Sequence, residues 1–249
     1  MEHAMRICVV MAMHAEAEPV VEMLGLRAVD RPPWASHVPM RLYEGKTRTN
    51  TIDLVVNGLD PDTGIDCIGT QAATASTMLG CEAFAPDLVV SAGTCGGFAC
   101  RGGEIGTVYL AHDRVWYHDR RVPLPGFDRF SRGGYPCLPL DSIADDLGFS
   151  SGVISTGDSL DLSPADARRI DEVGAHVKDM EAAAVAWIAG LFGAKFTAVK
   201  VVTDLVDGPH PTEQEFLENL SMATDRLAEA LTRFLREISD ADLKGSAPA

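Results

Sequence analysis

Short apolar runs alternate along the chain with longer stretches in which apolar residues recur every three or four positions. The runs are typical of buried β-strands, and the longer stretches are typical of helices that turn one face to a core. Strands are expected at residues 6–13, 51–58, 87–93, 105–119, 152–158 and 196–204. Helices are expected at residues 15–25, 66–80, 162–174, 179–192 and 212–238. The alternation predicts an α/β fold with three layers, α/β/α, around a mixed, largely parallel and twisted sheet.

Local signals mark the starts of two of these helices. The stretch "SPAD" places Pro164 at the first helical position, and Thr212 with Glu215 has the spacing of a capping box. The last helix carries an amphipathic stripe made of Phe216, Leu220, Ala223, Leu227, Leu231, Phe234 and Ile238.

The organisation of the chain is that of one domain. Residues 120–139 are rich in Pro and Gly and predict a long loop or flap, after which the alternation of strands and helices resumes. We expect a single domain over residues 1–249, with a core from about residue 6 to residue 238. The polar tail at residues 239–249 is expected to be frayed.

Composition and charge narrow the functional class. Hydrophobic residues make up 46% of the chain and aromatic residues 6%, so the core must be aliphatic. The net charge is −15 and no Lys/Arg-rich run is present, which argues against nucleic acid and anionic membranes as partners. The apolar run "ICVVMAM" is too short to span a membrane and lacks a signal-peptide cleavage region. We therefore expect a cytoplasmic protein.

Metal and cofactor motifs are not apparent. The six cysteines show no CxxC pair and are expected to be reduced thiols. His112 with Asp113 and His118 with Asp119 suggest metal ligands, but neighbours on a strand point to opposite faces. The chain also lacks the GxGxxG fingerprint and the Walker lysine. We expect neither a metal nor a cofactor.

Polar residues gather where the expected strands end, which is where ligands bind in open α/β sheets. Met13 and Glu16 follow the first strand. Thr203 and Asp204 end the last strand, and Glu181 opens the helix ahead of it. Three carboxylates at one edge of the sheet predict a ligand site.

Small residues follow two further strands, in "SAGTCGGF" and "STGDSLD", where a ligand can approach the backbone closely. Taken singly, each candidate has a simpler interpretation. Asp204 is also compatible with a turn former or N-cap, and Glu16 with a solvated helix residue. Met180 is compatible with a core position. An acid in a first helical turn, such as Glu181, is stabilised by the free N–H groups and the dipole alone.

Five segments together resemble a known family. "AMHAEAEP", "AGTCGGF", "STGDSLD", "KDMEAAAVA" and "VTDLVDG", in this order and spacing, are similar to the nucleoside phosphorylase/nucleosidase superfamily. Within it the chain resembles the 5′-methylthioadenosine/S-adenosylhomocysteine nucleosidases, and "HDRRVPLPGFD" and "TDLVDGPHPTEQEFLENL" resemble their plant-type branch. The resemblance implies a phosphorylase/hydrolase-like fold and hydrolysis of 5′-methylthioadenosine to adenine and the 5-thioribose product. S-adenosylhomocysteine is a further candidate substrate.

Two alternatives remain beside this function. A purine nucleoside phosphorylase of the same fold must hold a phosphate dianion, which calls for Arg and backbone N–H donors. The corresponding turn here carries Glu16 and no Arg, and a carboxylate repels phosphate but can take a proton from water. The second alternative is a catalytically silent nucleoside-binding protein, which the three retained carboxylates argue against.

The resemblance implies a role for each acid. Glu16 would position and deprotonate the attacking water, and Glu181 would bind the ribose hydroxyls and stabilise an oxocarbenium-like cation. Asp204 would protonate adenine N7, so burial is expected to raise its pKa. The helix end is expected to keep Glu181 ionised.

The resemblance also implies the binding residues. Met180 should pack against the ribose, and the backbone of Lys178 and Asp179 should hydrogen-bond the adenine edge. Leu160 takes the place of an adenine-stacking Phe found in some relatives, and Thr203 stands beside the acid. The glycine turn contributes Thr94, Cys95 and Gly96.

The 5′-alkylthio group requires an apolar pocket, for which the candidates are Met13, Thr63, Pro125, Phe127 and Phe216. In the family a neighbouring subunit closes this pocket, so we expect a homodimer. The implied physiological role is nucleoside catabolism in methionine salvage.

Overall fold

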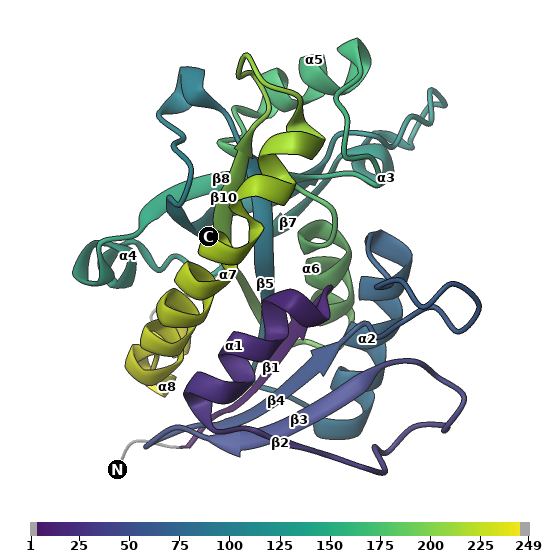
Figure 1. Cartoon of the computed structure of the whole chain (residues 1–249). Coiled ribbons are helices and arrows are strands. Elements are labelled where there is room, and N and C mark those ends of the chain that lie inside the picture. The colour runs from purple at the N-terminus through teal and green to yellow at the C-terminus, as the bar shows by residue number, and fades with distance from the viewer. Residues whose placement is uncertain (1–3, 245–249) are drawn as a thin grey trace.

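The computed structural model describes residues 4–244, in which helices surround one mixed sheet (Figure 1). In chain order the strands are β1 (Arg6–Met11), β2 (Arg27–Ala28), β3 (Arg41–Lys46), β4 (Thr51–Val56), β5 (Leu88–Gly97), β6 (Val108–Tyr117), β7 (Gly133–Pro136), β8 (Ser150–Thr156), β9 (Val177–Asp179) and β10 (Lys195–Leu205). The α-helices are α1 (His14–Leu24), α2 (Thr70–Phe84), α3 (Asp128–Arg132), α4 (Asp141–Leu147), α5 (Pro164–Val173), α6 (Ala182–Leu191), α7 (Thr212–Glu237) and α8 (Asp240–Lys244), with a 3₁₀ turn η1 (Ala99–Arg101). The mixed α/β fold predicted from the alternation is confirmed.

The sheet curls on itself around β5. β5 pairs in parallel with β1 on one side and β10 on the other, and β10 also pairs antiparallel with β6. β6 pairs with β8, β8 pairs with β9, and β9 returns antiparallel to β5. The strands β5, β10, β6, β8 and β9 therefore form a closed ring, from which β1, β4, β3 and β2 extend. The ring brings the ends of strands that are distant in sequence to one place.

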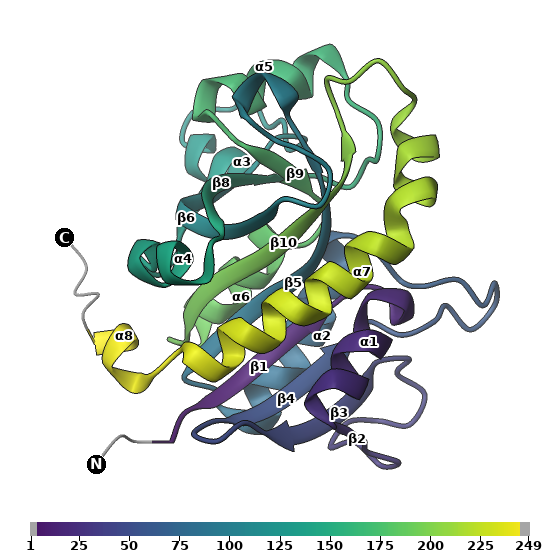
Figure 2. The ribbon, with the colours of Figure 1, turned by 60° about the vertical axis from the view of Figure 1, so that its left-hand side comes forward.

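Side-chain alternation along β1 divides the core between two faces. Ile7, Val9 and Met11 belong to the cluster that includes α1 and α7, whereas Cys8 and Val10 belong to the cluster with α2 and α6. Figure 2 shows α1 and α7 crossing one face of the strands, with α2 and α6 behind them. The three layers follow from this alternation.

The amphipathic stripe predicted for the last helix is confirmed in α7. Leu227, Leu231 and Phe234 are completely buried against the sheet. Leu217, on the opposite side of the helix, is 72% exposed. Burial of the stripe stabilises α7 along most of its length.

The helix starts differ in how well local signals predicted them. In α5, Ser163 caps the helix by accepting a hydrogen bond from the Asp166 N–H, and Pro164 begins it as predicted. In α7 the expected capping box is absent, because the Glu215 carboxylate instead accepts the Leu205 N–H at 2.8 Å. Glu215 thereby ties the helix to the end of β10.

Three irregular regions were predicted incorrectly. Residues 120–139 are not one continuous loop, because α3 and β7 lie within them and β7 pairs with β6. The segment "AGTCGGF" is not a turn, because β10 and β9 hold β5 in the sheet as far as Gly97. The tail predicted to fray from residue 239 carries α8, whose Leu243 is buried, while residues 245–249 lie outside the described residues.

None of the helices within residues 4–244 combines the length and the apolar character that crossing a membrane requires.

Replacing Phe234 by Ala should lower the free energy of unfolding by about 3–5 kcal/mol, because it leaves a cavity between α7 and the sheet. The control is Leu217→Ala on the exposed side of the same helix, which should change stability by no more than about 0.5 kcal/mol. Urea unfolding followed by circular dichroism measures both, and equal losses would contradict the packing of α7.

Candidate active site

A pocket of about 350 Å³ opens where β1, β5, β9 and β10 end, a volume typical of small-molecule sites. Most of the predicted site residues meet there although they come from distant parts of the chain. The predicted residues that line the pocket are Met13, Glu16, Thr94, Cys95, Gly96, Leu160, Lys178, Asp179, Met180, Glu181, Thr203, Asp204 and Phe216. The converging strand ends therefore form one cavity.

Three predicted positions, Thr63, Pro125 and Phe127, do not line this pocket within one chain. Thr63 is held in an exposed turn, where its hydroxyl donates to Asp60 Oδ1 at 2.9 Å. Phe127 is 45% exposed beside α3. Within one chain, these residues are not part of the apolar end of the pocket.

Three lining residues escaped prediction, namely Ala12, Ile68 and Ser159. Ile68 belongs to the segment between β4 and α2 and lies within the stretch 66–80 that was predicted as a helix. Leu59 and Ile65 are also apolar in this segment, so no sequence signal distinguished Ile68, which is 50% exposed.

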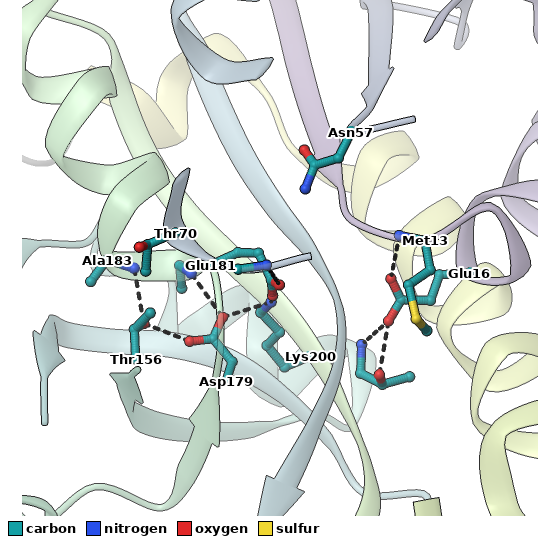
Figure 3. A network of polar contacts seen from close by, with 12 residues as sticks. Met13, Glu16, Asn57, Thr70, Thr156, Asp179, Glu181, Ala183 and Lys200 are labelled. Carbon is teal, nitrogen blue, oxygen red and sulfur yellow. Dashed lines mark hydrogen bonds and ion pairs between the residues drawn. The ribbon is translucent and has the colours of Figure 1, made fainter. Parts of the chain in front are cut away.

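Glu16 is buried at the start of α1 and its carboxylate is fixed by three donors. Oε1 accepts the Thr94 N–H at 2.7 Å and the Thr94 hydroxyl at 2.8 Å, and Oε2 accepts the Met13 N–H at 3.3 Å (Figure 3). A Cβ at Gly93 would lie 3.2 Å from Oε1, so glycine leaves room for this close approach. Glu16 is therefore not a solvated helix residue but a single, oriented carboxylate facing the pocket.

Asp204 lies at an irregularity near the end of β10 and its two oxygens have different environments. Oδ1 accepts the Thr203 hydroxyl at 2.7 Å. Oδ2 is buried and has no hydrogen-bond partner within residues 4–244. Burial raises the pKa of Asp204, whereas the Thr203 hydrogen bond and the charge of Lys178 oppose this change. The direction agrees with the sequence-based expectation, and a protonated Oδ2 can donate to a ligand.

Glu181 immediately precedes α6 and is held between a backbone donor and a cation. Oε1 accepts the Gly69 N–H at 3.1 Å, and Oε2 lies 3.7 Å from Lys200 Nζ (Figure 3). Burial raises the pKa of Glu181 to about 7, and the charges of Asp179 and Glu16 act in the same direction. Lys200 and the Gly69 N–H lower it.

The group that stabilises the negative charge of Glu181 is not the helix end that the sequence predicted. The side chain makes no hydrogen bond to the first turn of α6, so the helix end is not its main partner. Lys200, which is 1% exposed, supplies the favourable charge instead. The available signal was a lysine inside the apolar run "FTAVKVVTD", because a buried lysine requires a buried carboxylate.

Asp179, rather than Glu181, makes the side-chain hydrogen bond to the first turn of α6. Its Oδ2 accepts the Ala182 N–H at 2.8 Å and lies 2.8 Å from Lys200 Nζ. Its Oδ1 accepts the Thr156 hydroxyl at 2.5 Å (Figure 3). The Asp179 side chain is thus saturated by protein contacts, which leaves Glu181 free to face a ligand.

Lys178 organises another wall of the pocket. Its ammonium donates to the carbonyl oxygens of Ser159, Leu160 and Asp161, each at 2.7 Å, which uses all three of its N–H donors. Burial lowers the pKa of Lys178, and the charge of Asp204 opposes this. The three bonds fix the loop that presents Leu160 to the pocket.

The other titratable candidates do not form a metal centre. No group of three or more His, Cys, Asp or Glu in the described part of the chain is arranged to hold a metal ion. His112 Nδ1 lies 2.9 Å from Asp141 Oδ1, and the buried His118 contacts the Ser155 hydroxyl at 3.1 Å. Burial lowers the pKa of His118. All six cysteines are free thiols.

The three acids around the pocket differ in what they can do. Glu16 is an oriented acceptor, Asp204 has an open oxygen that favours a proton, and Glu181 is a carboxylate beside a cation. Such a set can protonate a leaving group, stabilise a cationic intermediate and activate water.

Comparisons with known proteins agree with this arrangement. A family model described as "Phosphorylase superfamily" matches residues 6–236. The chain is 41% identical over 234 residues to a 5′-methylthioadenosine nucleosidase of Arabidopsis thaliana, covering 94% of this chain and 87% of the relative. It is 39% identical over 233 residues to a 5′-methylthioadenosine/S-adenosylhomocysteine nucleosidase of the same plant, covering 94% and 91%. The apo structure of an Arabidopsis thaliana 5′-methylthioadenosine nucleosidase matches with a TM-score of 0.92 at 39% identity, covering 96% of this chain and 99% of that chain.

Replacing Lys200 by Met removes the buried cation while keeping the length of the side chain. The pKa of Glu181 should then rise above about 7, and the free energy of unfolding above neutral pH should fall by about 3–5 kcal/mol. Carbon NMR titration of labelled glutamate carboxyls and urea unfolding measure the two effects. Lys195→Met, at the start of the same strand, is the control, and an unchanged Glu181 titration would contradict the role given to Lys200.

Proposed function

The chain belongs to the phosphorylase superfamily, and on this premise we propose that it hydrolyses the N-glycosidic bond of 5′-methylthioadenosine to adenine and 5-methylthioribose. The observation that carries the choice of hydrolysis is the fixed Glu16 carboxylate in the pocket wall. None of the described residues that line the pocket is an arginine. A phosphate dianion would meet a negative charge there, whereas water would meet a base.

Asp204 is the general acid for the departing base. A proton on its buried Oδ2 is donated to N7 of adenine, which lets the N9–C1′ electron pair leave with a neutral purine. Oδ2 has no hydrogen-bond partner within residues 4–244, so it is available to donate its proton to N7 of adenine. The Thr203 hydroxyl holds the other oxygen and thereby the orientation of the carboxyl group.

Glu181 stabilises the ribosyl cation that forms as the glycosidic bond breaks. Its carboxylate accepts hydrogen bonds from the ribose hydroxyls and places negative charge beside the oxocarbenium-like ring. The ionised form is required for this, and Lys200 favours that form. Met180, beside Glu181 in the pocket wall, packs against the ribose.

Glu16 completes the reaction by activating water. The carboxylate takes a proton from water as the oxygen attacks C1′, and this proton later returns to solvent while Asp204 is reprotonated. Thr94 and Met13 hold the carboxylate in the orientation that the attack requires. The reaction consumes one water and forms no phosphorylated sugar.

The remaining lining residues bind the two ends of the nucleoside. The backbone of Lys178 and Asp179 hydrogen-bonds the adenine edge, and Leu160 contacts its face. Met13, Ile68 and Phe216 surround the 5′-methylthio group. S-adenosylhomocysteine, which the name of one relative includes, is the second proposed substrate.

We further propose that the protein acts as a cytoplasmic homodimer in methionine salvage. Exposed apolar side chains on α2, on the segment just before it, on α6 and around α3 support a covering partner. These elements lie on one side of the molecule in Figure 1. The exposed side chains include Ile68, Met78, Phe127, Phe130 and Trp187. Because Ile68 also lines the pocket, a second copy on this side would close the 5′ end. Free thiols support a reducing compartment.

Incubation of the purified protein with 5′-methylthioadenosine should release adenine at the same rate with and without phosphate. Glu16→Gln, Glu181→Gln and Asp204→Asn should each lower kcat by roughly 100-fold or more with unchanged circular dichroism. Glu18→Gln, an exposed acid on α1, is the control and should keep full activity. Strict phosphate dependence would support the phosphorylase, and binding without turnover would support the silent binding protein.

The pH dependence of kcat/KM should be bell-shaped. Activity should fall as the pH drops below about 7, because Glu181 becomes protonated and loses the charge that stabilises the cation. Activity should also fall at high pH, because Asp204 loses the proton that it donates, with the raised pKa extending the active range upward. Lys200→Met should move the acid limb to higher pH. A rate that keeps increasing into acid would contradict these roles.

A further inference from the structure

The backbone donor of Glu181 comes from the start of α2. The Gly69 N–H reaches Glu181 Oε1 at 3.1 Å. Gly69 precedes the first residue of α2, has φ of +90° and offers no side chain to cap the helix. The location of this N–H, and with it one of the contacts that orient Glu181, therefore depends on what holds the first turn of α2.

A carboxylate from a distant loop holds that turn. Asp158, in the loop after β8, accepts the Thr70 N–H on Oδ1 and the Thr70 hydroxyl on Oδ2, both at 2.6 Å. This is the bond pattern of an N-cap, supplied here by a residue 88 positions away in the sequence. Two charge-assisted bonds to one residue fix the turn both in position and in rotation.

The loop that carries Asp158 is itself anchored. The Asp158 N–H donates to Asp119 Oδ2 at 2.7 Å, just beyond the end of β6. A Cβ at residue 69 would lie 2.7 Å from Asp158 Oδ1, so the contact requires glycine there in addition to its positive φ. A series of contacts thus leads from the end of β6 to the pocket. It passes from Asp119 through Asp158, Thr70 and Gly69 to Glu181.

We propose that Asp158 is a positioning residue for Glu181, acting through the first turn of α2. Asp158 does not line the pocket and touches no group that reacts. The inference rests on the proposed function, since it assigns a part in the stabilisation of the ribosyl cation. Asp158 sets where the Gly69 N–H meets the carboxylate that faces the sugar.

The proposal can be tested through the pKa of Glu181, because the Gly69 N–H is one of the groups that set it. Glu181 faces Lys200 from β10, Asp179 from β9 and Glu16 from α1, and its pKa is lowered by Lys200 and, to a smaller extent, by the Gly69 N–H. Loss of the Gly69 contact removes one of these contributions, so burial and the two acids raise the pKa further. The acid limb of kcat/KM should then lie at higher pH.

The test compares Asp158→Ala, Asp158→Asn and Thr70→Val with the wild type, using 5′-methylthioadenosine over a range of pH. Asp158→Ala should lower kcat roughly ten-fold, the size expected for one hydrogen bond to a charged group, and move the acid limb upward. Asp158→Asn should be intermediate, because its carbonyl can still accept the Thr70 N–H. Asp146→Ala, an exposed acid on α4, is the control and should match the wild type.

Thr70→Val loses only the hydroxyl bond, so the double variant with Asp158→Ala should be no worse than Asp158→Ala alone. If Asp158→Ala does not fold, the same readouts on Asp158→Asn decide the matter. A fall in kcat without movement of the acid limb would show a structural role only and overturn the proposal, as would wild-type behaviour of both variants. If the wild type itself does not cleave the nucleoside, the proposed function fails instead.

Discussion

The ammonium of Lys200 is the contact on which the arrangement of the site depends. It is buried on β10, a strand of the closed ring, and lies 2.8 Å from Asp179 and 3.7 Å from Glu181. Burial and the charge of Asp179 raise the pKa of Glu181, and the buried Lys200 cation lowers it, so Lys200 favours the ionised form of Glu181. With the cation present, Asp179 can cap α6 while Glu181 remains free to face the pocket. The closure of the ring through β10 and β9 is what brings the three side chains together.

The proposed reaction requires opposite protonation states of two carboxyl groups in the same pocket, and the surroundings of each group favour the state it needs. Glu181 has a cation and a backbone N–H, which favour the charged form that a ribosyl cation needs. Asp204 has one hydroxyl donor and a buried open oxygen, and burial favours the protonated form that a leaving purine needs. Glycines at positions 93 and 96 make room for the acids, since a Cβ at Gly96 would lie 2.9 Å from Asp204 Oδ2. The surroundings of the two carboxyl groups, rather than their residue types, determine that Asp204 is the proton donor and Glu181 the charged stabilising group.

The sequence predicted the features that depend on local pattern. Apolar periodicity predicted six of the ten strands, five of the eight α-helices in the described residues and the buried stripe of α7. It missed the strands β2, β3, β7 and β9 and the short helices α3, α4 and α8. The strand-end rule led to Glu16, Glu181 and Asp204, which line one pocket. The sequence could not predict the ring, because pairing of β9 with β5 and of β10 with β6 joins segments far apart and leaves no periodic trace. It missed Lys200 as a partner of Glu181, although a lysine inside an apolar run was a signal for a buried carboxylate. The candidates Thr63, Pro125 and Phe127 do not line the pocket within one chain.

Neutron diffraction of the protein with a non-cleavable carbon-linked analogue of 5′-methylthioadenosine tests the central claim most directly. At a pH above the Glu181 pKa of about 7, the account predicts a deuteron between Asp204 and N7 of the purine, and none on Glu181 beside a fully deuterated Lys200 ammonium. An ionised Asp204 together with a protonated Glu181 would contradict it.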